Sequence, residues 1–136
     1  MLGKVKRFIP ANVAHVQTDG SFRMATRHSR TAVLLQTHTG QLHKQVNHYL
    51  THQNGHESEW QSIYDGILLS IRNDQWAVEL ENDCFGVVAG IVGKQTVNPK
   101  YVDYYLSIKN EIRQLDYFRI KWIPRELNRA DSLFRN

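Results

Sequence analysis

The stretch VAHVQTDGS, residues 13–21, decides how the rest of this sequence is interpreted. Val13 to Thr18 has the β-branched, alternating character of a strand, and we expect that strand to reach Asp19 and to break at Gly20. A carboxylate at this point lies on rigid backbone near the centre of a sheet. Three more acids stand at the predicted start of a helix or at the end of a strand that leads into one: Glu59, Asp83 and Asp131.

Length and composition indicate one globular domain over residues 1–136, with residues 1–12 as a short basic lead-in. Hydrophobic residues make up 41% of the chain and charged residues 22%, which argues against a disordered protein. The net charge of +4 favours a nucleic-acid partner only modestly. The single cysteine, Cys84, excludes an intramolecular disulfide and a cysteine-based zinc cluster.

The sequence predicts neither a membrane span nor a secretory signal. No apolar run approaches the ~20 residues of a membrane span, and no apolar block follows the charges at the N-terminus. We therefore expect an intracellular protein, cytoplasmic by default, that has no membrane partner and is a monomer.

Three strands are predicted in the first half of the chain, over residues 13–19, 31–37 and 42–50, and they form an antiparallel meander. The apolar period then changes from 2 to 3.6 over residues 60–71, which predicts an amphipathic helix with Ser58 as its N-cap.

The second half of the chain alternates strands and helices. A fourth strand over residues 75–80 leads to Asp83, and a short helix with residues 87, 88, 91 and 92 inward ends at Gly93. A helix begins at Asn98-Pro99, a fifth strand spans residues 117–123, and a last short helix spans residues 126–134. The predicted fold class is α/β: a mixed five-stranded sheet, a three-strand antiparallel meander plus two parallel strands, with helices on both faces.

The four carboxylates converge if the first and fourth strands are parallel neighbours, because sites gather at the carboxyl ends of such strands. Like charges at that range need compensation, which a divalent cation supplies. Oxygen ligands without cysteine favour Mg²⁺ or Mn²⁺ over zinc, and two such ions about 4 Å apart serve phosphodiester hydrolysis. Taken singly, each acid is more commonly a turn former or a helix-start residue, so the interpretation depends on all four together.

Other polar and aromatic residues are less informative. The histidines His48, His52 and His56 recur every four residues, which could indicate a metal site or a proton shuttle. A strand does not present residues four apart as a helical zinc motif does, so they are better explained as polar positions on a partly exposed strand and loop. Only His56 is kept as a neighbour of the site. Trp76 and Trp122 are expected in the core.

Four motifs in the right order resemble the type 1 ribonuclease H family in its shorter archaeal- and plant-like form, from Val13 to Arg135. They are TDGS (18–21), EWQSIYDGI (59–67), ENDCFGVV (81–88) and IPRELNRADSL (123–133). The resemblance implies a ribonuclease H-like fold and two Mg²⁺ ions, with Mn²⁺ as a substitute. It implies an endoribonuclease that hydrolyses the RNA strand of RNA-DNA hybrids, largely without sequence preference. The implied catalytic and metal-binding residues are Asp19, Glu59, Asp83 and Asp131, and the implied substrate-binding residues are Ser21, Arg23, Asn54, His56 and Asn128.

Departures from the family pattern keep two alternatives open. Gly55 and His56 stand where the family has paired asparagines, and no histidine precedes Asp131. The chain could therefore be a catalytically weak or inactive nucleic-acid-binding module on the same fold. It could also be another nuclease of this fold that acts on DNA or serves a retroelement polymerase.

Overall fold

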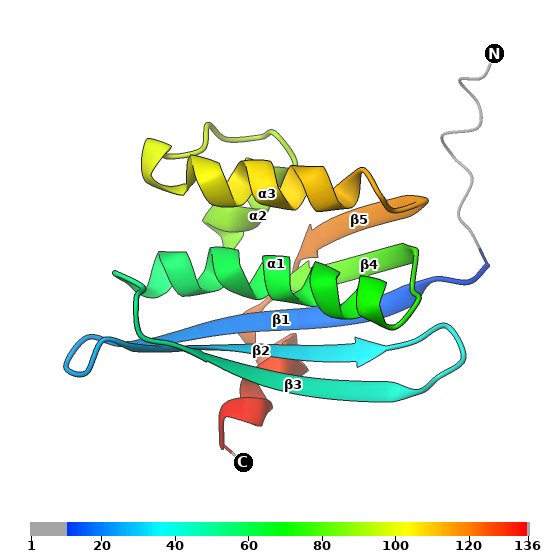
Figure 1. The fold of residues 1–136 in the computed structure, drawn as a ribbon, viewed down its shortest axis with the longest axis horizontal. Helices are drawn as coiled ribbons and strands as arrows, with labels where there is room; N and C mark the ends of the chain where they lie inside the picture. Colours follow the sequence, from blue (N-terminus) through cyan, green and yellow to red (C-terminus); the bar gives the residue numbers. More distant parts are fainter. Residues whose placement is uncertain (1–10, 136) are drawn as a thin grey trace.

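The computed structural model describes residues 11–135, so almost all of the predicted basic lead-in lies outside the described residues. The predicted order of strands and helices is confirmed (Figure 1). The strands are β1 (Ala14–Arg23), β2 (His28–Gln36), β3 (Leu42–Tyr49), β4 (Ala77–Asn82) and β5 (Tyr117–Trp122). The α-helices are α1 (Gly55–Arg72), α2 (Phe85–Ile91) and α3 (Val102–Ile112), and the 3-10 helices are η2 (Pro99–Tyr101), η3 (Arg125–Leu127) and η4 (Arg129–Arg135).

The five strands form one mixed sheet in the order β3-β2-β1-β4-β5. β1, β2 and β3 pair antiparallel as a meander, and β4 lies parallel to both β1 and β5. This arrangement confirms the predicted fold class. It also puts Asp19 of β1 close to Asp83, the residue directly after β4, at the centre of the sheet.

The predicted break of the first strand at Gly20 is wrong, because β1 continues to Arg23 and Gly20 pairs with Thr31 of β2. The glycine serves a different need. A Cβ at Gly20 would lie 2.6 Å from the backbone carbon of Ser58 and 2.7 Å from the backbone nitrogen of Glu59. Only glycine therefore lets α1 pack this closely on β1, and the close approach carries Glu59 to the side of Asp19.

Helix α1 begins earlier than predicted. Asn54 is its N-cap, and the Asn54 Oδ1 accepts from the Glu57 backbone N–H at 2.9 Å. Ser58, the predicted cap, is buried inside the helix and its hydroxyl donates to the Gly55 carbonyl at 2.7 Å. The sequence pattern favoured Ser58 because serine is a common cap, but asparagine serves equally well. As a result Glu59 lies in the second turn of α1, over the strand.

Helices α1, α2 and α3 cover one face of the sheet, and the C-terminal segment covers the other (Figure 1). The main core lies between the three helices and the sheet and includes Trp60. On the opposite face, Ala130 and Leu133 of η4 pack on Ala32 and Leu34 of β2. The last predicted helix is thus present but is 3-10 rather than α, as is common for short segments.

Three predicted core residues are exposed. Val92 is 46% exposed because α2 is only seven residues long and Val92 is its C-cap. Trp122 is 44% exposed because it lies at the end of the edge strand β5. Trp76 is 38% exposed, and its indole N–H donates to Asp74 Oδ1 at 3.2 Å. Within residues 11–135, no helix combines the length and the hydropathy that crossing a membrane would need.

Candidate metal centre

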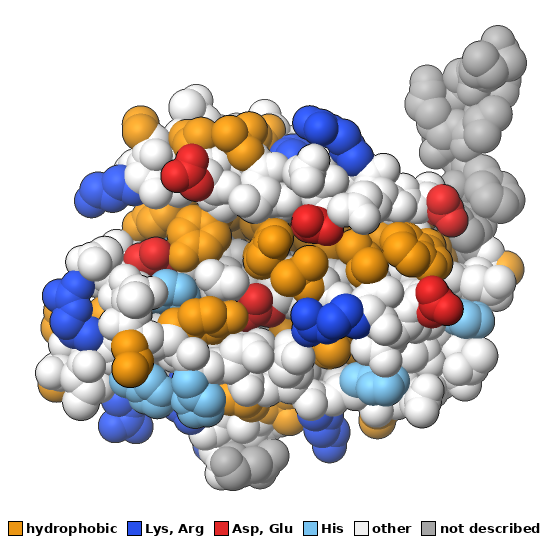
Figure 2. All heavy atoms as spheres, in the orientation of Figure 1, with side chains coloured by type: hydrophobic (Ala, Val, Ile, Leu, Met, Phe, Trp, Pro, Cys, Tyr) orange, Lys and Arg blue, Asp and Glu red, His pale blue; other side chains and the backbone are white. Residues whose placement is uncertain are grey.

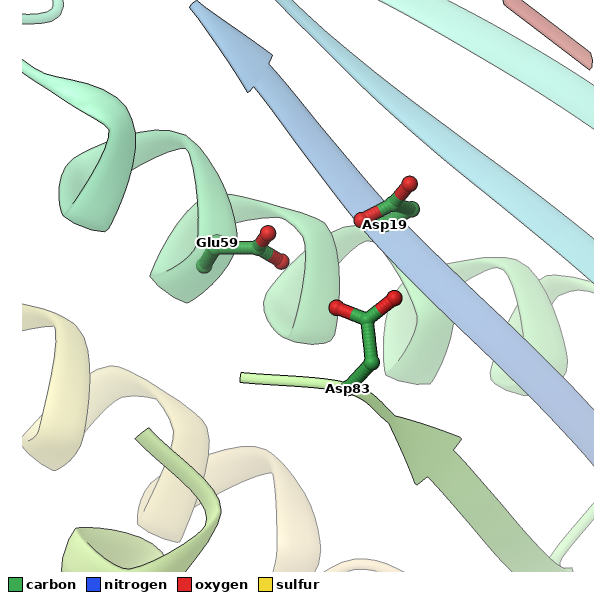
Figure 3. Close-up of side chains that lie close together, drawn as sticks. All are labelled: Asp19, Glu59 and Asp83. Carbon is green, nitrogen blue, oxygen red and sulfur yellow. The ribbon is translucent and has the colours of Figure 1, made fainter. Parts of the chain in front are cut away.

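Three carboxylates from three different elements meet above the centre of the sheet (Figure 3). Asp19 comes from β1, Glu59 from α1 and Asp83 from the bend after β4. One oxygen of each carboxylate lies within 4.8 Å of one oxygen of each of the others. The predicted convergence of these three residues is therefore present in the structure.

The electrostatics of this cluster are unfavourable for three negative charges. Burial, followed by the charges of Asp83 and Asp131, raises the pKa of Asp19 to about 7. Burial and then the charge of Asp19 raise the pKa of Glu59 to about 9. Burial also raises the pKa of Asp83, although the hydrogen bond from Asn128 opposes the shift. At neutral pH the cluster therefore holds protons unless a cation replaces them.

The donor set fits a hard divalent cation. Among the described residues no lysine or arginine lies within ion-pair distance of Asp19, Glu59 or Asp83. The ligand atoms are carboxylate oxygens without sulfur or imidazole among them, a set that suits Mg²⁺ or Mn²⁺ better than zinc. Asp19, Glu59 and Asp83 are thus the residues that would hold a metal ion.

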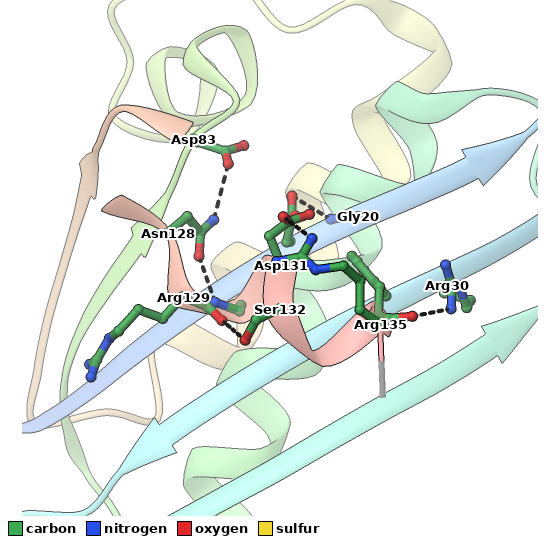
Figure 4. A network of polar contacts seen from close by, with 11 residues as sticks. Gly20, Arg30, Asp83, Asn128, Arg129, Asp131, Ser132 and Arg135 are labelled. Carbon is green, nitrogen blue, oxygen red and sulfur yellow. Dashed lines mark hydrogen bonds and ion pairs between the residues drawn. The ribbon is translucent and has the colours of Figure 1, made fainter. Parts of the chain in front are cut away.

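Asp131, the fourth predicted ligand, lies on the same cleft beside Asp19, but it is not one of the three residues whose carboxylate oxygens all lie within 4.8 Å of one another. The cleft has a volume of about 590 Å³, and Asp131 lines it from η4. Its carboxylate Oδ2 accepts from the Arg135 guanidinium at 2.9 Å (Figure 4). This hydrogen bond holds the pKa of Asp131 below its usual value. Asp131 is therefore the one acid of the four that already has a cationic partner.

The predicted substrate-binding residues are spread over several places. Ser21 lines the carboxylate cleft, while Arg23 is exposed at the end of β1. Asn54 caps α1 and also accepts from the Tyr101 hydroxyl at 3.2 Å. His56 lines a separate cavity of about 270 Å³ beside Trp60 and Tyr101, so it does not lie in the carboxylate cleft.

Asn128 is buried between η3 and η4, and its amide is engaged within the protein. Its Nδ2 donates to the Thr18 carbonyl at 2.9 Å and to Asp83 Oδ2 at 3.2 Å. Two arginines also line the carboxylate cleft, Arg30 of β2 and Arg125 of η3. Positive side chains at the rim of an acidic cleft are suited to hold phosphate groups.

The other histidines do not join the carboxylates. Histidine side chains gather on the lower part of the face shown in Figure 2. His28 and His48 contact each other, with 3.0 Å between Nε2 and Nδ1, and the Nδ1 of the buried His52 lies 2.7 Å from the Ser29 hydroxyl. His48 is an exposed residue of β3, as predicted. His52 lies in the loop after β3 and is buried against Ser29 and Tyr49, so its prediction as an exposed polar position is wrong.

The chain is similar to known proteins at the level of family and fold. A family model described as reverse transcriptase-like matches residues 17–134. The similar solved structures include a ribonuclease H1 from the halophilic archaeon Halobacterium salinarum, with 18% identity, a TM-score of 0.82 and coverage of 89% of this chain and 93% of that one. The N-terminal ribonuclease H domain of a Mycobacterium tuberculosis protein has 18% identity, a TM-score of 0.81 and 90% coverage of both chains.

A third similar structure is a ribonuclease H1 isolated from compost by a metagenomic approach and solved in complex with an RNA/DNA hybrid. It has 20% identity, a TM-score of 0.76 and coverage of 88% of this chain and 92% of that one. At these identities the likeness concerns the fold. No curated protein sequence matches this chain at a significant level.

Proposed function

The chain belongs to the reverse transcriptase-like family, and we propose that it is a metal-dependent nuclease that hydrolyses the RNA strand of RNA-DNA hybrids. The observation that carries the proposal is the group formed by Asp19, Glu59 and Asp83, whose oxygens lie within 4.8 Å of one another without a cationic side chain between them. Such a group is costly for a fold to keep unless it binds a cation. The similar ribonuclease H1 in complex with an RNA/DNA hybrid supports the choice of substrate.

In this proposal Asp19, Glu59 and Asp83 hold Mg²⁺, or Mn²⁺ in its place, with Asp131 as a further ligand for a second ion. When bound, two such ions supply an activated water and stabilise charge on the leaving oxygen. The chain's own residues do the rest. Gly20 and the cap at Asn54 fix the position of α1, and α1 in turn fixes Glu59 over Asp19.

Substrate binding would draw on the rim of the cleft. Arg30 and Arg125 line it and carry the positive charge that phosphate groups require. RNA is distinguished from DNA by its 2′-hydroxyl groups, which are exposed in the wide minor groove. Ser21 also lines the cleft and can exchange hydrogen bonds with a hydroxyl. None of these contacts reads a base, so cleavage should depend little on sequence.

The test is cleavage of a labelled RNA-DNA hybrid in Mg²⁺ and then in Mn²⁺, beside single-stranded RNA and duplex DNA. The expected result is metal-dependent cleavage of the RNA strand of the hybrid only. Asp83→Asn should abolish it, while Asp74→Asn, the same change in an exposed turn with φ of 62°, should not. A folded protein that binds the hybrid without cutting it would instead be a binding module, and cleavage of the DNA substrate would indicate another nuclease of this fold.

A further inference from the structure

One fully buried polar side chain at the metal centre belongs to a residue outside the predicted site. Asn82 is the last residue of β4, directly before Asp83, and it is 0% exposed. Its backbone lies beside Thr18 of β1 in the parallel pairing of the two strands. A fully buried amide must satisfy both its donors and its acceptor, so its partners define what it does.

The two ends of the Asn82 side chain contact three elements of the site. Its Nδ2 donates toward the hydroxyl and the carbonyl of Thr18, at 3.0 and 3.1 Å, and toward Glu59 Oε1 at 3.3 Å. Its Oδ1 accepts from the backbone N–H of Cys84 at 2.8 Å, on the bend that carries Asp83. One side chain therefore ties β1, α1 and the Asp83 bend together.

The contact with Glu59 restricts the orientation of the Glu59 carboxylate. Glu59 Oε1 accepts from Asn82 and also from the backbone N–H of Gly20, at 3.1 Å. Two donors on Oε1 hold this oxygen in place, so Oε2 is the oxygen of Glu59 that remains available to a cation. Asn82 thus limits how Glu59 can turn relative to Asp19.

Asn128 makes a matching set of contacts from the other side of the cleft. Its Nδ2 donates to the same Thr18 carbonyl at 2.9 Å and to Asp83 Oδ2 at 3.2 Å (Figure 4 shows the bond to Asp83). The Thr18 carbonyl has two lone pairs, and the two asparagines use both. The residue after this carbonyl is Asp19, so one backbone group of β1 anchors the two amides that orient Glu59 and Asp83.

We propose that Asn82 and Asn128 are positioning residues of the metal centre, which hold Glu59 and Asp83 in fixed orientations on either side of Asp19. The inference rests on the proposed function only in taking the three carboxylates as metal ligands. Hydrogen-bond partners of metal ligands commonly contribute 10–100-fold to metal affinity or activity. The pair thus serves the ligands and does not itself contact the substrate.

The test compares Asn82→Ala and Asn128→Ala with the unaltered protein. Asn73→Ala is the matched control, because the Asn73 amide also bonds a backbone carbonyl, that of Leu69 at 2.8 Å, but at the far end of α1. Mn²⁺ binding is measured by calorimetry without substrate, at a temperature where circular dichroism shows each variant folded. Cleavage of the hybrid is then followed as kcat and KM.

The expected result is an approximately tenfold or larger rise in the Kd for Mn²⁺ in both site variants and little change in Asn73→Ala. The value of kcat should fall at subsaturating metal and recover at saturating metal, while KM for the hybrid stays the same. A smaller fraction of folded enzyme would instead lower kcat at every metal concentration. Asn128 lies between two 3-10 turns, outside the sheet, so its variant keeps the test available if Asn82→Ala does not fold.

The outcomes separate this inference from the proposed function. Mn²⁺ affinities within about twofold of the unaltered protein in both folded variants would overturn the inference alone. An unaltered protein that binds Mn²⁺ but cuts no hybrid would overturn the proposed substrate, and the weaker binding of the variants would still support the inference. An unaltered protein that binds no Mn²⁺ would overturn both.

Discussion

Two aspartates in this protein are equally buried but are surrounded differently. Asp19 and Asp65 are each 7% exposed; Asp19 lies on β1, and Asp65 lies on α1, which packs on β1 and β2. Asp65 accepts hydrogen bonds from four neutral side chains: Thr31 at 2.7 Å, Tyr49 at 2.7 Å, Gln61 at 3.0 Å and Asn47 at 3.3 Å. Asp19 faces Glu59 and Asp83 instead.

The difference separates a structural carboxylate from a functional one. The donors around Asp65 satisfy its oxygens within the fold, so it joins α1 to β2 and β3 without any ligand. The carboxylates around Asp19 repel it, so that site is completed only by something from outside the chain. Burial alone would not have distinguished the two residues, but their partners do.

The largest expected effect comes from removing the negative charge of Asp19 in the carboxylate cluster. Asp19→Asn should lower hybrid cleavage more than about 100-fold, because it removes a metal ligand. The same change should raise the free energy of unfolding of the metal-free protein at pH 8, because it relieves repulsion. Turnover assays and urea unfolding in a chelator measure both. Retained cleavage, or a less stable metal-free variant, would contradict the assignment of Asp19.

The opposite pattern is expected for Asp65. Asp65→Ala should lower the free energy of unfolding by about 2–4 kcal/mol, because it leaves buried donors without an acceptor. The turnover of the folded variant should be close to that of the unaltered protein. Urea unfolding beside an activity assay at low temperature tests this. A loss of turnover at full stability would show that Asp65 belongs to the functional site.

The pH dependence of stability should also differ between metal-free and metal-bound protein. The folded-state pKa values of Asp19 and Glu59, about 7 and about 9, lie above their ordinary values of 3.8 and 4.5. A group whose pKa is higher in the folded than in the unfolded state stabilises the fold at pH values below its unfolded-state pKa. This stabilisation is lost as the pH rises through the folded-state pKa. The Tm of the metal-free protein should therefore fall between about pH 4 and pH 9, and Mg²⁺ should reduce the fall. A metal-free Tm that rises over this range would contradict the account.

The smallest expected effect concerns Asp131, which already has a partner. Its ion pair with Arg135 is an exposed i,i+4 contact of the kind that contributes only a few tenths of a kcal/mol. Arg135→Ala should leave stability nearly unchanged and should lower the Mg²⁺ concentration for half-maximal cleavage about twofold, because it removes a competing cation. Arg129→Ala, on the same segment, is the control. A higher Mg²⁺ requirement would show that Arg135 helps the site instead.

The order of strands and helices and the meeting of three carboxylates could be predicted from the sequence. Both depend on local patterns, namely the alternation of apolar residues in strands, the helical period and the ends of strands. The sequence was misleading where a residue contacts another that is distant along the chain. Gly20 looked like a strand terminator, but its absence of a side chain is needed for α1, which lies almost 40 residues later. Asp65 lies within the predicted helix but outside its apolar stripe, and nothing local predicts donors from β2 and β3.

A signal for Asn82 was available in the sequence. Residues 78, 80 and 82 share one face of β4, and the first two are Val78 and Leu80, so the same alternation predicts a buried Asn82. A buried amide directly before a predicted ligand is a candidate for positioning that ligand. The partners of Asn128 could not be predicted in this way, because Asn128 lies between two 3-10 turns without a regular period.

The central claim is that the carboxylate cluster holds protons until a metal ion replaces them. Calorimetric titration with Mn²⁺ at pH 7, repeated in buffers of different ionisation enthalpy, measures the protons released on binding. The account predicts binding with release of about one to two protons, since Asp19 and Glu59 have raised pKa values, and a smaller release in Asp19→Asn. Binding without proton release, or no binding to the folded protein, would contradict it.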